Sequence, residues 1–446
     1  MAGDDATSAE CTIGPLYGRQ ARSLQHAPGV GSWKGLNMNA YLVGGAVRDR
    51  LLGLSVTDRD WVVVGRTPAD MIDAGFRPVG KDFPVFLHPE THDEYALART
   101  ERKSGPGYRG FVVNADASVT LEEDLSRRDL TINAIAMHED GSFIDPYNGR
   151  GDIEARVLRH VSPAFIEDPV RVLRVARFMA RLAPCGFSVA EETRSLMQDM
   201  VATGELEHLV AERVWQELEG ALAAPAPRQF IDTLRSCGAL GVVLPEVDRL
   251  FGVPQPAEHH PEIDSGEHSL LVLEQAVLRD TSVDTRLAAL LHDLGKGTTP
   301  VEQWPRHPGH EGRGAEIVID LAERLRFPKQ ARDLATLSAR YHGQAHDVES
   351  LRATTIARLL EALDVVRKPE RFERFLIVCE ADSRGRLGFE DRPYPQAAIL
   401  RLLAESWRSV DAGAVAKATS EKARIPETVR NTRLAALRGV RVQNGN

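Results

Sequence analysis

Two carboxylates, those of Asp58 and Asp60, flank Arg59 at the start of a strand that we predict over residues 60–64. Side chains at positions i and i+2 of a strand point to the same side, so the two carboxylates converge. Two like charges side by side are costly unless a cation neutralises them, and oxygen ligands at this spacing suit Mg²⁺. An isolated D-x-D sequence is most often a solvated strand end, so a metal site needs a second signal.

That second signal is a glycine pair, Gly44 and Gly45, between a predicted strand at 41–43 and a predicted helix at 46–52. The free N–H groups of a helix N-terminus favour phosphate, and glycine lets a phosphate approach the backbone closely. Arg48 lies in the first turn, where its guanidinium is able to bind a phosphate through two hydrogen bonds. A metal-bound triphosphate needs both parts, so this β-α-β unit favours a nucleotide site over an ordinary strand and turn.

A further charged cluster, Arg127, Arg128 and Asp129, precedes the apolar segment 130–137. The arginines are suited to holding phosphates, and Asp129 is able to accept a hydrogen bond from a ribose hydroxyl. A helix cap with a surface arginine pair is the alternative interpretation, and the cluster alone is only moderately specific.

Four arginines lie on one face of the helix that we predict to begin at residues 167–169. At 100° per residue they fall within an arc of roughly 120°. No acidic residue occurs between 169 and 190 to neutralise them, and all four are Arg rather than Lys. Planar guanidinium groups suit phosphates and base edges, so a binding face is favoured over a solvated one. The four residues are Arg171, Arg174, Arg177 and Arg181.

Together these segments resemble the class II tRNA nucleotidyltransferase family, which includes the bacterial poly(A) polymerases. The matching motifs are LVGGAVRD at 42–49, DRD at 58–60, RRDLTIN at 127–133 and EDPVR at 167–171. The resemblance covers residues 38–446. It implies a polymerase-β-like nucleotidyltransferase head followed by helical neck, body and tail regions. The implied reaction is template-independent transfer of CMP and AMP from CTP and ATP to the 3′ end of tRNA, which builds the terminal CCA.

The resemblance assigns roles to the residues that match the family motifs. It implies that Asp58 and Asp60 are the catalytic carboxylates and bind Mg²⁺, and that Gly45 and Arg48 contact the triphosphate of ATP or CTP. It does not identify a third carboxylate in the head, for which the sequence offers three adjacent candidates. These candidates are Glu122, Glu123 and Asp124.

The same resemblance implies that Arg128 and Asp129 hold the incoming nucleotide, with Asp129 near its ribose. It also implies that Asp168 and Arg171 read the base edge of CTP or ATP. The chemistry agrees, because an Asp–Arg pair offers both acceptors and donors to a base edge. Fixed side chains would then replace a nucleic-acid template. The other residues implied to line this pocket are Arg174 and Arg177.

His292 and Asp293 follow an apolar helix that includes residues 287–291. Together with His268 upstream and Asp382 downstream, they resemble the H…HD…D pattern of HD phosphohydrolases. The resemblance implies that these four residues bind Ni²⁺, Mn²⁺, Co²⁺ or Mg²⁺, which imidazole and carboxylate together suit. It implies phosphatase, 2′-nucleotidase and 2′,3′-cyclic phosphodiesterase activities, against the alternative of a degenerate, purely structural HD domain. Nearby imidazoles are those of His307, His310 and His342.

The residues leave two other functions open. A poly(A) polymerase of the same family would use the same head on a different acceptor. The HD region and the absence of a long basic C-terminal extension favour CCA addition over that activity. A phosphohydrolase for RNA repair or metabolites, with a non-catalytic RNA-binding head, would not need the Asp58 and Asp60 carboxylates for its main activity.

The composition bounds the partners of the chain. Its 446 residues carry a formal net charge of −9, which excludes a uniformly basic coat and leaves a local track for the acceptor and T arm of tRNA. Residues 103–107 have the composition of a mobile loop. Candidate track residues besides the arginine stripe are Arg99, Arg102, Lys103 and Arg109.

The chain lacks the features of exported and membrane proteins. The first residues lack the basic and apolar parts of a signal peptide, and no apolar run approaches the ~18 residues of a membrane helix. The four cysteines form no C-x-x-C pair, so a zinc–thiolate site is not expected and a reducing compartment is. We therefore expect a cytoplasmic protein with no membrane partner, monomeric or homodimeric.

These segments require an α+β head followed by a long helical body. Strand signals continue to about residue 146, and amphipathic helices dominate beyond 150. Met38 is a candidate start of translation. We predict a disordered extension at 1–37, the nucleotidyltransferase head at 38–150, a helical neck and body that binds RNA at 151–255, an HD phosphohydrolase domain at 256–390, and C-terminal helices at 391–446.

Overall fold

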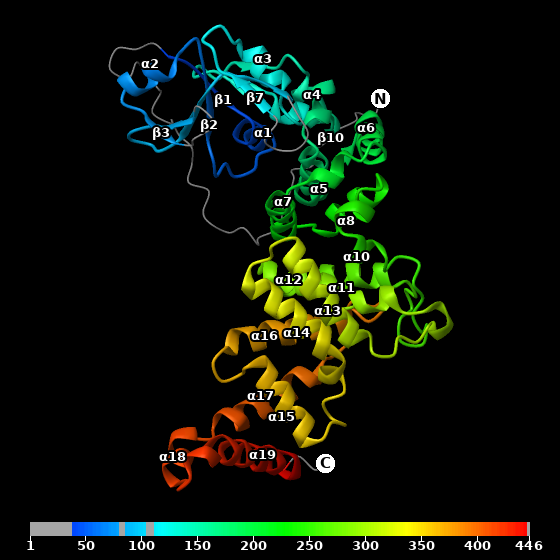
Figure 1. Cartoon of the computed structure of the whole chain (residues 1–446). Helices are drawn as coiled ribbons and strands as arrows, with labels where there is room; N and C mark the ends of the chain where they lie inside the picture. Colours follow the sequence, from blue (N-terminus) through cyan, green and yellow to red (C-terminus); the bar gives the residue numbers. More distant parts are fainter. Residues whose placement is uncertain (1–37, 80–84, 104–110, 444–446) are drawn as a thin grey trace, which may run out of the picture. The chain divides into compact units, whose positions relative to one another are not determined.

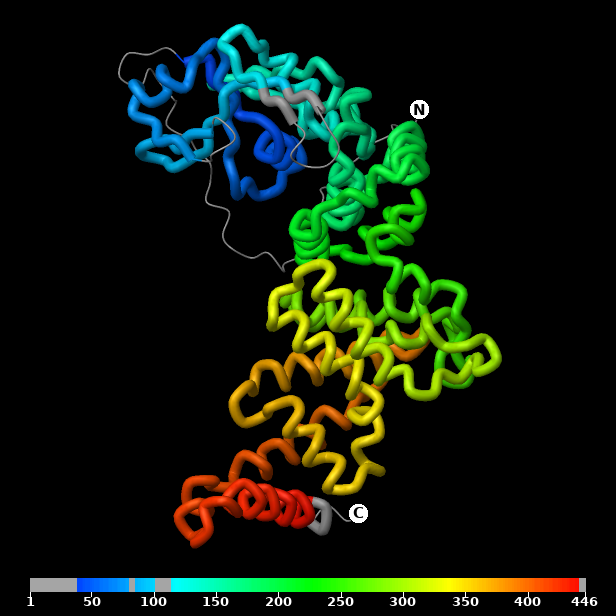
Figure 2. The backbone as a smooth tube through the Cα atoms, viewed as in Figure 1, coloured from blue at the N-terminus to red at the C-terminus, as the bar shows by residue number. Residues whose placement is uncertain are grey.

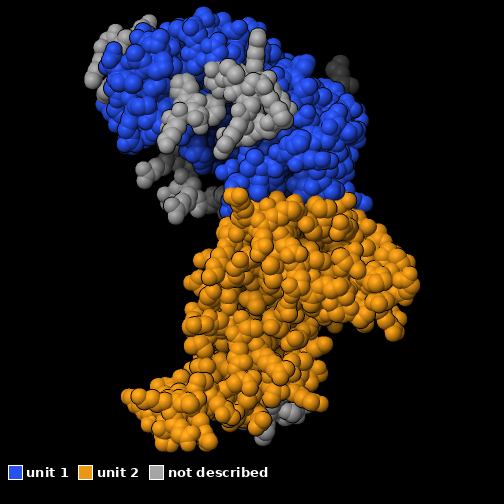
Figure 3. All heavy atoms as spheres, in the orientation of Figure 1, with its two compact units in different colours: residues 1–243 blue, residues 244–446 orange. Residues whose placement is uncertain are grey.

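The computed structural model describes residues 38–79, 85–103 and 111–443. The chain divides into two compact units, residues 1–243 and residues 244–446 (Figure 3). This boundary falls inside the segment that the sequence predicts as neck and body. The predicted extension at 1–37, the segment 104–107 of the predicted loop and Arg109 lie outside the described residues.

The first unit begins with a mixed sheet whose strand order is β3-β4-β5-β2-β1-β8-β9 (Figure 1). Strands β2 and β5 are parallel, and the other neighbours in this sheet are antiparallel. Its strands are β1 (Asn39–Val43), β2 (Asp60–Val64), β3 (Arg77–Val79), β4 (Val85–Leu87), β5 (Glu94–Leu97), β8 (Ala136–Met137) and β9 (Phe143–Ile144). A separate hairpin pairs β6 (Thr100–Lys103) with β7 (Phe111–Asn114).

Both faces of this sheet are buried, which fixes the direction of the side chains at its edge. Successive strand residues point to opposite faces, so Val62 and Val63 of β2 enter different cores. Val63 packs in one core with Met71, and Val62 packs in the other with Leu125. Strand β2 spans the residues predicted for it, 60–64, and the α+β head expected from the sequence is confirmed.

The rest of the first unit is helical, apart from a short parallel pair of strands that the sequence did not indicate. Strands β10 (Val157–Leu158) and β11 (Ser188–Val189) form this pair. Helix α5 packs against α7 and α8, with Leu173 and Ala176 fully buried. The helices are α1 (Gly45–Leu51), α2 (Pro68–Asp73), α3 (Leu121–Ser126), α4 (Gly149–Ala155), α5 (Val170–Leu182), α6 (Glu191–Ala202), α7 (Ala211–Ala223), α8 (Arg228–Ser236) and α9 (Leu240–Val243).

The second unit is built from helices throughout its described residues, and Figure 2 shows how its backbone winds from one helix to the next. Val272, Ala289 and Ala381 share one core, and small residues here let α11, α12 and α16 approach closely. None of the helices in the described part of the chain is both long and apolar enough to cross a lipid bilayer. The helices are α10 (Pro245–Asp248), α11 (Ser265–Arg279), α12 (Val283–Leu291), α13 (His310–Arg324), α14 (Lys329–His346), α15 (Ala353–Leu363), α16 (Pro369–Arg384), α17 (Pro395–Arg408), α18 (Ala412–Ala418) and α19 (Ile425–Gln443).

Candidate active sites in the two units

A cavity of about 1280 Å³ in the first unit gathers all the residues outside the HD pattern to which the resemblance assigns a role in nucleotide or metal binding. Pockets for small ligands commonly have volumes of about 300–1000 Å³, so this cavity has room for a nucleotide. The predicted site residues that line it are Gly45, Arg48, Asp58, Asp60, Arg128, Asp129, Asp168, Arg171, Arg174 and Arg177.

Strand pairing places the carboxylate pair at the edge of this cavity. Strand β2 begins at Asp60, which is in register with Val43 of β1 on one side and Glu94 of β5 on the other. Desolvation in the cavity raises the pKa of Asp60; the Arg128 guanidinium opposes this shift, and the Asp58 carboxylate adds to it. Two adjacent carboxylates that disfavour each other's charge are a fitting donor set for a divalent cation.

Glu94 also lines the cavity, whereas the three candidates for a third carboxylate lie elsewhere. Glu123 closes a capping box with Thr120 at the start of α3, and the backbone oxygen of Glu122 accepts a hydrogen bond from Tyr147. The sequence did not point to Glu94, because its position beside Asp60 depends on the parallel pairing of β2 with β5.

Asp124, the third of those candidates, is fully buried and positions the neighbouring arginines. It accepts hydrogen bonds from Arg127 Nη2 at 2.8 Å and from Arg128 Nη2 at 3.2 Å. Burial alone would raise the pKa of Asp124, but the two guanidinium charges outweigh it and hold the pKa below its ordinary value. Asp124 therefore fixes the arginines and is not one of the residues that line the cavity.

The glycine turn lies between β1 and α1, where the sequence predicts it. Gly44 has φ +67°, a left-handed backbone conformation that favours glycine, and a Cβ there would lie 3.0 Å from Arg128 Nη1. Arg48 is buried and donates from Nη1 to Asn133 Oδ1 at 2.7 Å and from Nε to Asp49 Oδ1 at 2.8 Å. The turn, Arg48 and Arg128 are thus held together by contacts within the head.

Asp129 is buried at the centre of this network. Its Oδ1 accepts hydrogen bonds from Asn133 Nδ2 and from the Leu130 backbone, and its Oδ2 accepts one from Arg174 Nε at 2.8 Å. Burial alone would raise the pKa of Asp129, but Arg174 and these hydrogen bonds outweigh it and hold the pKa well below its ordinary value. Asp129 is therefore ionised at neutral pH.

The prediction of an unneutralised arginine stripe on α5 is wrong. Acidic residues from other elements reach the stripe: Arg177 Nε donates to Glu217, and Arg181 Nη2 donates to Asp49 Oδ2 at 2.7 Å. Arg174 pairs with Asp129 as described above, and Arg171 is buried and donates to two backbone oxygens. The local sequence lacks acids because the acids come from distant segments.

Arg213 of α7 is a cavity residue that sequence reasoning missed. It donates from Nη1 to Asp168 Oδ1 at 3.0 Å and from Nη2 to Asp168 Oδ2 at 2.7 Å, in a two-pronged pair. Such a pair fixes the plane of the Asp168 carboxylate. The sequence signal available for this residue was its i, i+4 spacing with Glu217, which puts both side chains on one face of α7. In the structure Arg213 contacts Asp168, just before α5, and Glu217 contacts Arg177 of α5.

The proposed RNA track is only partly described. Arg99 lines the cavity and its backbone N–H donates to Asp124. Arg102 and Lys103 lie in β6, and their side chains are outside the described part of the structure, as is Arg109. The track therefore stays a prediction.

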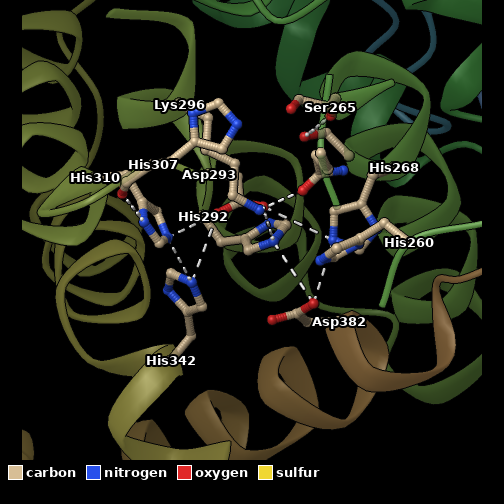
Figure 4. Close-up of polar contacts among 12 residues, drawn as sticks. His260, Ser265, His268, His292, Asp293, Lys296, His307, His310, His342 and Asp382 are labelled. Atoms are coloured by element: carbon tan, nitrogen blue, oxygen red, sulfur yellow. Dashed lines mark hydrogen bonds and ion pairs between the residues drawn. The ribbon is translucent and has the colours of Figure 1, made fainter. Parts of the chain in front are cut away.

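In the second unit the four predicted HD residues come together from helix α11, the turn that follows helix α12, and helix α16 (Figure 4). His268 Nε2 lies 3.2 Å from Asp382 Oδ1 and 3.8 Å from Asp293 Oδ2. His292 Nε2 lies 3.1 Å from Asp293 Oδ2 and 3.9 Å from Asp382 Oδ1. The four side chains are almost completely buried. Residues that are more than a hundred positions apart in the sequence thus place their donor atoms in one cluster.

The orientation of the imidazoles fits a metal ion. His268 Nδ1 donates to Glu262 Oε1 and to the Gly385 backbone oxygen, and His292 Nδ1 donates to the Ala289 backbone oxygen. In the neutral rings Nε2 then carries the lone pair and points into the cluster. His268 Nε2 and His292 Nε2 are buried without a hydrogen-bond partner among the described residues, as is Asp293 Oδ1. Buried donor atoms without a hydrogen-bond partner suit a bound cation.

Charges around the cluster set its ionisation. Burial alone would raise the pKa of Asp293, but His292 and Lys296 outweigh it and hold this pKa well below its ordinary value. Burial alone would lower the pKa of His292, but the carboxylates of Asp293 and Asp382 outweigh it and raise this pKa. Burial lowers the pKa of His342 to about 3, so this imidazole is neutral at ordinary pH.

Further residues hold the cluster in place, and the sequence gave no specific sign of them. Glu262 accepts hydrogen bonds from His260 Nδ1 and from His268 Nδ1, both at 3.0 Å. His346 Nε2 donates to Asp382 Oδ2 at 2.7 Å, and Lys296 Nζ donates to Asp293 Oδ2 at 2.5 Å. These contacts orient the candidate metal ligands and restrict their motion.

Family models match three consecutive parts of the chain. The poly A polymerase head domain matches residues 40–159, the probable RNA and SrmB-binding site of polymerase A matches 186–251, and the HD domain matches 266–383. Fold and sites therefore define a polymerase-type head joined to an HD domain. This confirms the predicted fold class.

Curated relatives narrow the class to one family. A multifunctional CCA protein of Thioalkalivibrio sulfidiphilus is 64% identical over 364 residues, which are 82% of this chain and 89% of that protein. One from Alkalilimnicola ehrlichii is 59% identical over 400 residues, 90% of this chain and 97% of that protein. The chain belongs to the multifunctional CCA protein family, and the resemblance seen in the motifs is confirmed.

Solved structures share the fold at low sequence identity. The CCA-adding enzyme of Bacillus stearothermophilus in complex with CTP has a TM-score of 0.59 and 23% identity, covering 92% of this chain and 91% of that one. The CCA-adding enzyme of Thermotoga maritima complexed with tRNA-CCA has a TM-score of 0.58 and 19% identity, covering 92% and 90%.

Proposed function

We propose that the chain adds the 3′-terminal CCA to tRNA from CTP and ATP, in synthesis and in repair. The observation that carries this proposal is the single cavity shared by the Gly44–Gly45 turn, Asp58 and Asp60, and the α5 arginines. A phosphate-binding turn, a metal-binding pair and base-edge donors are the three parts that a nucleotidyl transfer needs. Membership of the multifunctional CCA protein family supports the same reaction.

In this reaction the tRNA 3′-hydroxyl attacks the α-phosphate of the bound nucleotide and pyrophosphate leaves. Asp58 and Asp60 would hold Mg²⁺, which when bound polarises the phosphate and favours deprotonation of the attacking hydroxyl. Gly45 and Arg48 would bind the triphosphate, while Arg128 would contact its oxygens. These groups are preorganised by the hydrogen bonds of Asn133, Asp49 and Asp124.

Base selection falls to the residues of α5 and its neighbours. Asp168 would accept hydrogen bonds from the exocyclic amino group that C and A both carry, and G and U lack at that position. Arg213 fixes the carboxylate of Asp168 for this purpose. Arg171, Arg174 and Arg177 would complete the base and ribose pocket beside Asp129. No nucleic-acid template is needed, because these side chains supply the pairing edge.

The direct test is incubation of the full chain with tRNA that lacks its CCA end and with CTP or ATP alone. We expect two C residues from CTP alone and no addition from ATP alone until the C residues are present. Repeated addition of A without CTP would instead favour poly(A) polymerase, a candidate that the match of the poly A polymerase head domain keeps open.

We further propose that the HD site hydrolyses phosphoesters, as a 2′,3′-cyclic phosphodiesterase, 2′-nucleotidase and phosphatase. The supporting observation is the convergence of His268, His292, Asp293 and Asp382, in which the Nε2 atoms of both imidazoles have no hydrogen-bond partner in the described part of the chain. Imidazole and carboxylate ligands suit Ni²⁺, Mn²⁺, Co²⁺ or Mg²⁺, and a bound ion supplies a hydroxide at neutral pH. An RNA-repair phosphohydrolase with a non-catalytic head would show this activity alone.

Chelation tests the hydrolytic proposal. Protein stripped of metal is expected to lose hydrolysis of a 2′,3′-cyclic nucleotide and to regain it with one or more of the four ions, assayed separately. Unchanged hydrolysis after complete removal of metal would overturn the proposal. Absence of hydrolysis with every ion would support a structural HD domain.

The remaining expectations concern partners and location. Binding of the tRNA acceptor and T arm is expected to weaken steeply with salt, because it rests on phosphate contacts. A flat response to salt would contradict a basic track. A cytoplasmic location and a monomeric or homodimeric state stay predictions that fractionation and light scattering would check.

A further inference from the structure

One aromatic ring lies among the arginines of the head cavity. Phe178 of α5 lines this cavity and is 4% exposed. The guanidinium carbons of Arg177, Arg48 and Arg174 lie over its ring, 4.9 Å, 5.1 Å and 5.8 Å from the ring centre. A cation within about 6 Å of the centre of an aromatic ring is attracted by the negative charge of the ring face. Phe178 is thus within reach of three cations at once.

The three cations come from two separate helices. Arg174 and Arg177 belong to α5, and the helical periodicity places Phe178 on the same face as these arginines. Arg48 is buried and belongs to α1, which is distant in sequence. Proximity within one helix accounts for the contacts of Phe178 with the α5 arginines, but not for its contact with Arg48. The ring therefore joins two elements of the cavity.

The guanidinium groups around the ring also donate to carboxylates. The pairs are Arg48 with Asp49, Arg174 with Asp129 and Arg177 with Glu217. Burial lowers the pKa of Arg48; the Asp49 carboxylate opposes this shift, and the Arg181 charge adds to it. Several like charges in a buried space are costly. The ring face offsets part of this cost and uses no N–H donor, so it leaves the hydrogen-bonding capacity of the arginines to a substrate.

We propose that Phe178 is a positioning residue for nucleotide binding, which holds the triphosphate arginine Arg48 and the base-pocket arginines Arg174 and Arg177 in one arrangement. This inference rests on the proposed CCA-adding function and deepens it. Without the ring, the three cations would spread over more rotamers before a nucleotide binds. Ordering them would then cost affinity. Because the same arginines serve both nucleotides, CTP and ATP should be affected alike.

The alternative role of Phe178 is to fill space in the core. A buried phenylalanine commonly stabilises a protein through its volume alone. Fluorine atoms on the ring separate the two roles, because they weaken the negative charge of the ring face and change the shape of the side chain little. A ring that only fills space should tolerate them.

The main test uses the full chain with one, two or three fluorine atoms on the phenylalanine at position 178. The dissociation constants for CTP and ATP are titrated with Mg²⁺ and without tRNA. We expect both to rise with each added fluorine, by roughly 3- to 30-fold with three. In the tRNA assay KM should rise in parallel while kcat changes little. Affinities that do not depend on the number of fluorine atoms would overturn the proposal.

The same fluorinated series at Phe230 is the matched control. Phe230 of α8 is similarly buried, lies outside the cavity and has no arginine over its ring in the described part of the chain. We expect its series to bind CTP and ATP with wild-type affinity. A loss at Phe230 equal to that at Phe178 would show a general effect of fluorine on the fold and contradict the positioning role.

A double-mutant cycle tests whether the ring acts through an arginine. Phe178→Leu should weaken CTP binding in the wild-type chain and weaken it less in an Arg177→Gln background. Strictly additive losses would contradict the coupling. Circular dichroism checks folding, and the fluorinated series decides the question if the leucine variant does not fold.

Incorporation of CMP into tRNA lacking CCA is measured in the same samples. A chain that binds CTP with the expected dependence on fluorine but adds no CMP would refute the proposed function and leave the role of Phe178 in place. A chain that adds CCA with the same affinity throughout the series would refute the role of Phe178 and leave the function in place. A wild-type chain that binds neither CTP nor ATP would refute both.

Discussion

In the head cavity, carboxylates that line the site meet arginines, whereas in the HD centre carboxylates meet imidazole lone pairs. Asp129, Asp168 and Asp49 each pair with a guanidinium from α5 or α7, so the protein itself balances most of the charge. In the HD centre Lys296 pairs with Asp293 and Arg386 pairs with Asp382, while His268 and His292 turn their Nε2 atoms toward the same two carboxylates. The difference supports the proposal that one site is preorganised for a substrate and the other for ions.

Asp58 and Asp60 differ from these paired carboxylates of the head. Among the described residues, no arginine lies within hydrogen-bond distance of either carboxylate. They resemble the HD centre in this respect, and we propose that an added cation balances the carboxylates in both sites. Substitutions in each site therefore test whether the distinction between protein-balanced and ion-balanced carboxylates is real.

The largest effect is expected from Asp60→Ala. Loss of a Mg²⁺ ligand should lower incorporation of CMP into tRNA lacking CCA by roughly 100- to 1000-fold. Hydrolysis of a 2′,3′-cyclic nucleotide should stay unchanged, because the HD residues belong to another unit. Asp73→Ala, an exposed acid of α2 outside the cavity, serves as the control. Equal losses in both variants would contradict a specific role for Asp60.

A smaller loss is expected from Arg213→Ala, which releases the Asp168 carboxylate. Misplacing a substrate-positioning group commonly costs up to about 100-fold, so we expect roughly 10- to 100-fold in kcat/KM for CTP and for ATP. Discrimination against UTP and GTP should fall as well. Arg213→Lys should restore little of it, because lysine cannot form the two-pronged pair.

Arg150→Ala, a change to an exposed arginine outside the cavity, should leave these kinetic values at the wild-type level. Unaltered nucleotide discrimination in Arg213→Ala would show that Asp168 does not depend on Arg213.

In the HD centre, Glu262→Gln tests the orientation of a metal ligand. Burial alone would raise the pKa of Glu262, but its hydrogen bonds from His260 and His268 hold the pKa well below its ordinary value. The buried Glu262 side chain is therefore an ionised carboxylate. Replacing such a partner typically weakens metal binding by 10- to 100-fold, and we expect about tenfold for Mn²⁺ measured by titration. A variant with wild-type affinity would refute this positioning role.

The smallest effect concerns acid stability of the head. The pKa of Asp129 is lowered in the folded state, so its contribution to stability is present above the ordinary value near 4 and is lost as the pH falls through the folded pKa. Asp129→Asn should therefore unfold more easily at pH 7, by about 2 kcal/mol, and lose less stability than wild type below pH 4. Denaturant titrations at both pH values measure this, and parallel curves would contradict it.

The sequence predicts features whose parts are close together in the chain. The strand, glycine turn and carboxylate pair at residues 41–64 form one local unit, and the four HD residues were found because their pattern is specific. The pairing of Asp168 with Arg213, of Asp60 with Glu94, and of α5 with distant acids could not be predicted. Each depends on packing between separate elements, and the local absence of acids around α5 gave a misleading indication.

The same reason explains the HD imidazoles. His310 and His342 were recognised as nearby in sequence, but their convergence on Asp293 Oδ1 depends on packing between elements. Helix α14 packs against α12, and α13 packs against α14 and the 3-10 helix Leu294–Thr298. Their tautomers depend on backbone oxygens of His307 and Ser338, which no sequence pattern specifies.

The central claim is that the two units carry separate chemistry, and one variant tests it most directly. Asp293→Asn removes the carboxylate charge at the centre of the HD cluster and changes no head residue. Assayed in one preparation, it is predicted to lose hydrolysis of a 2′,3′-cyclic nucleotide by at least roughly 100-fold and to add CCA to tRNA at the wild-type rate. Loss of both activities together, or retention of hydrolysis, would contradict the account.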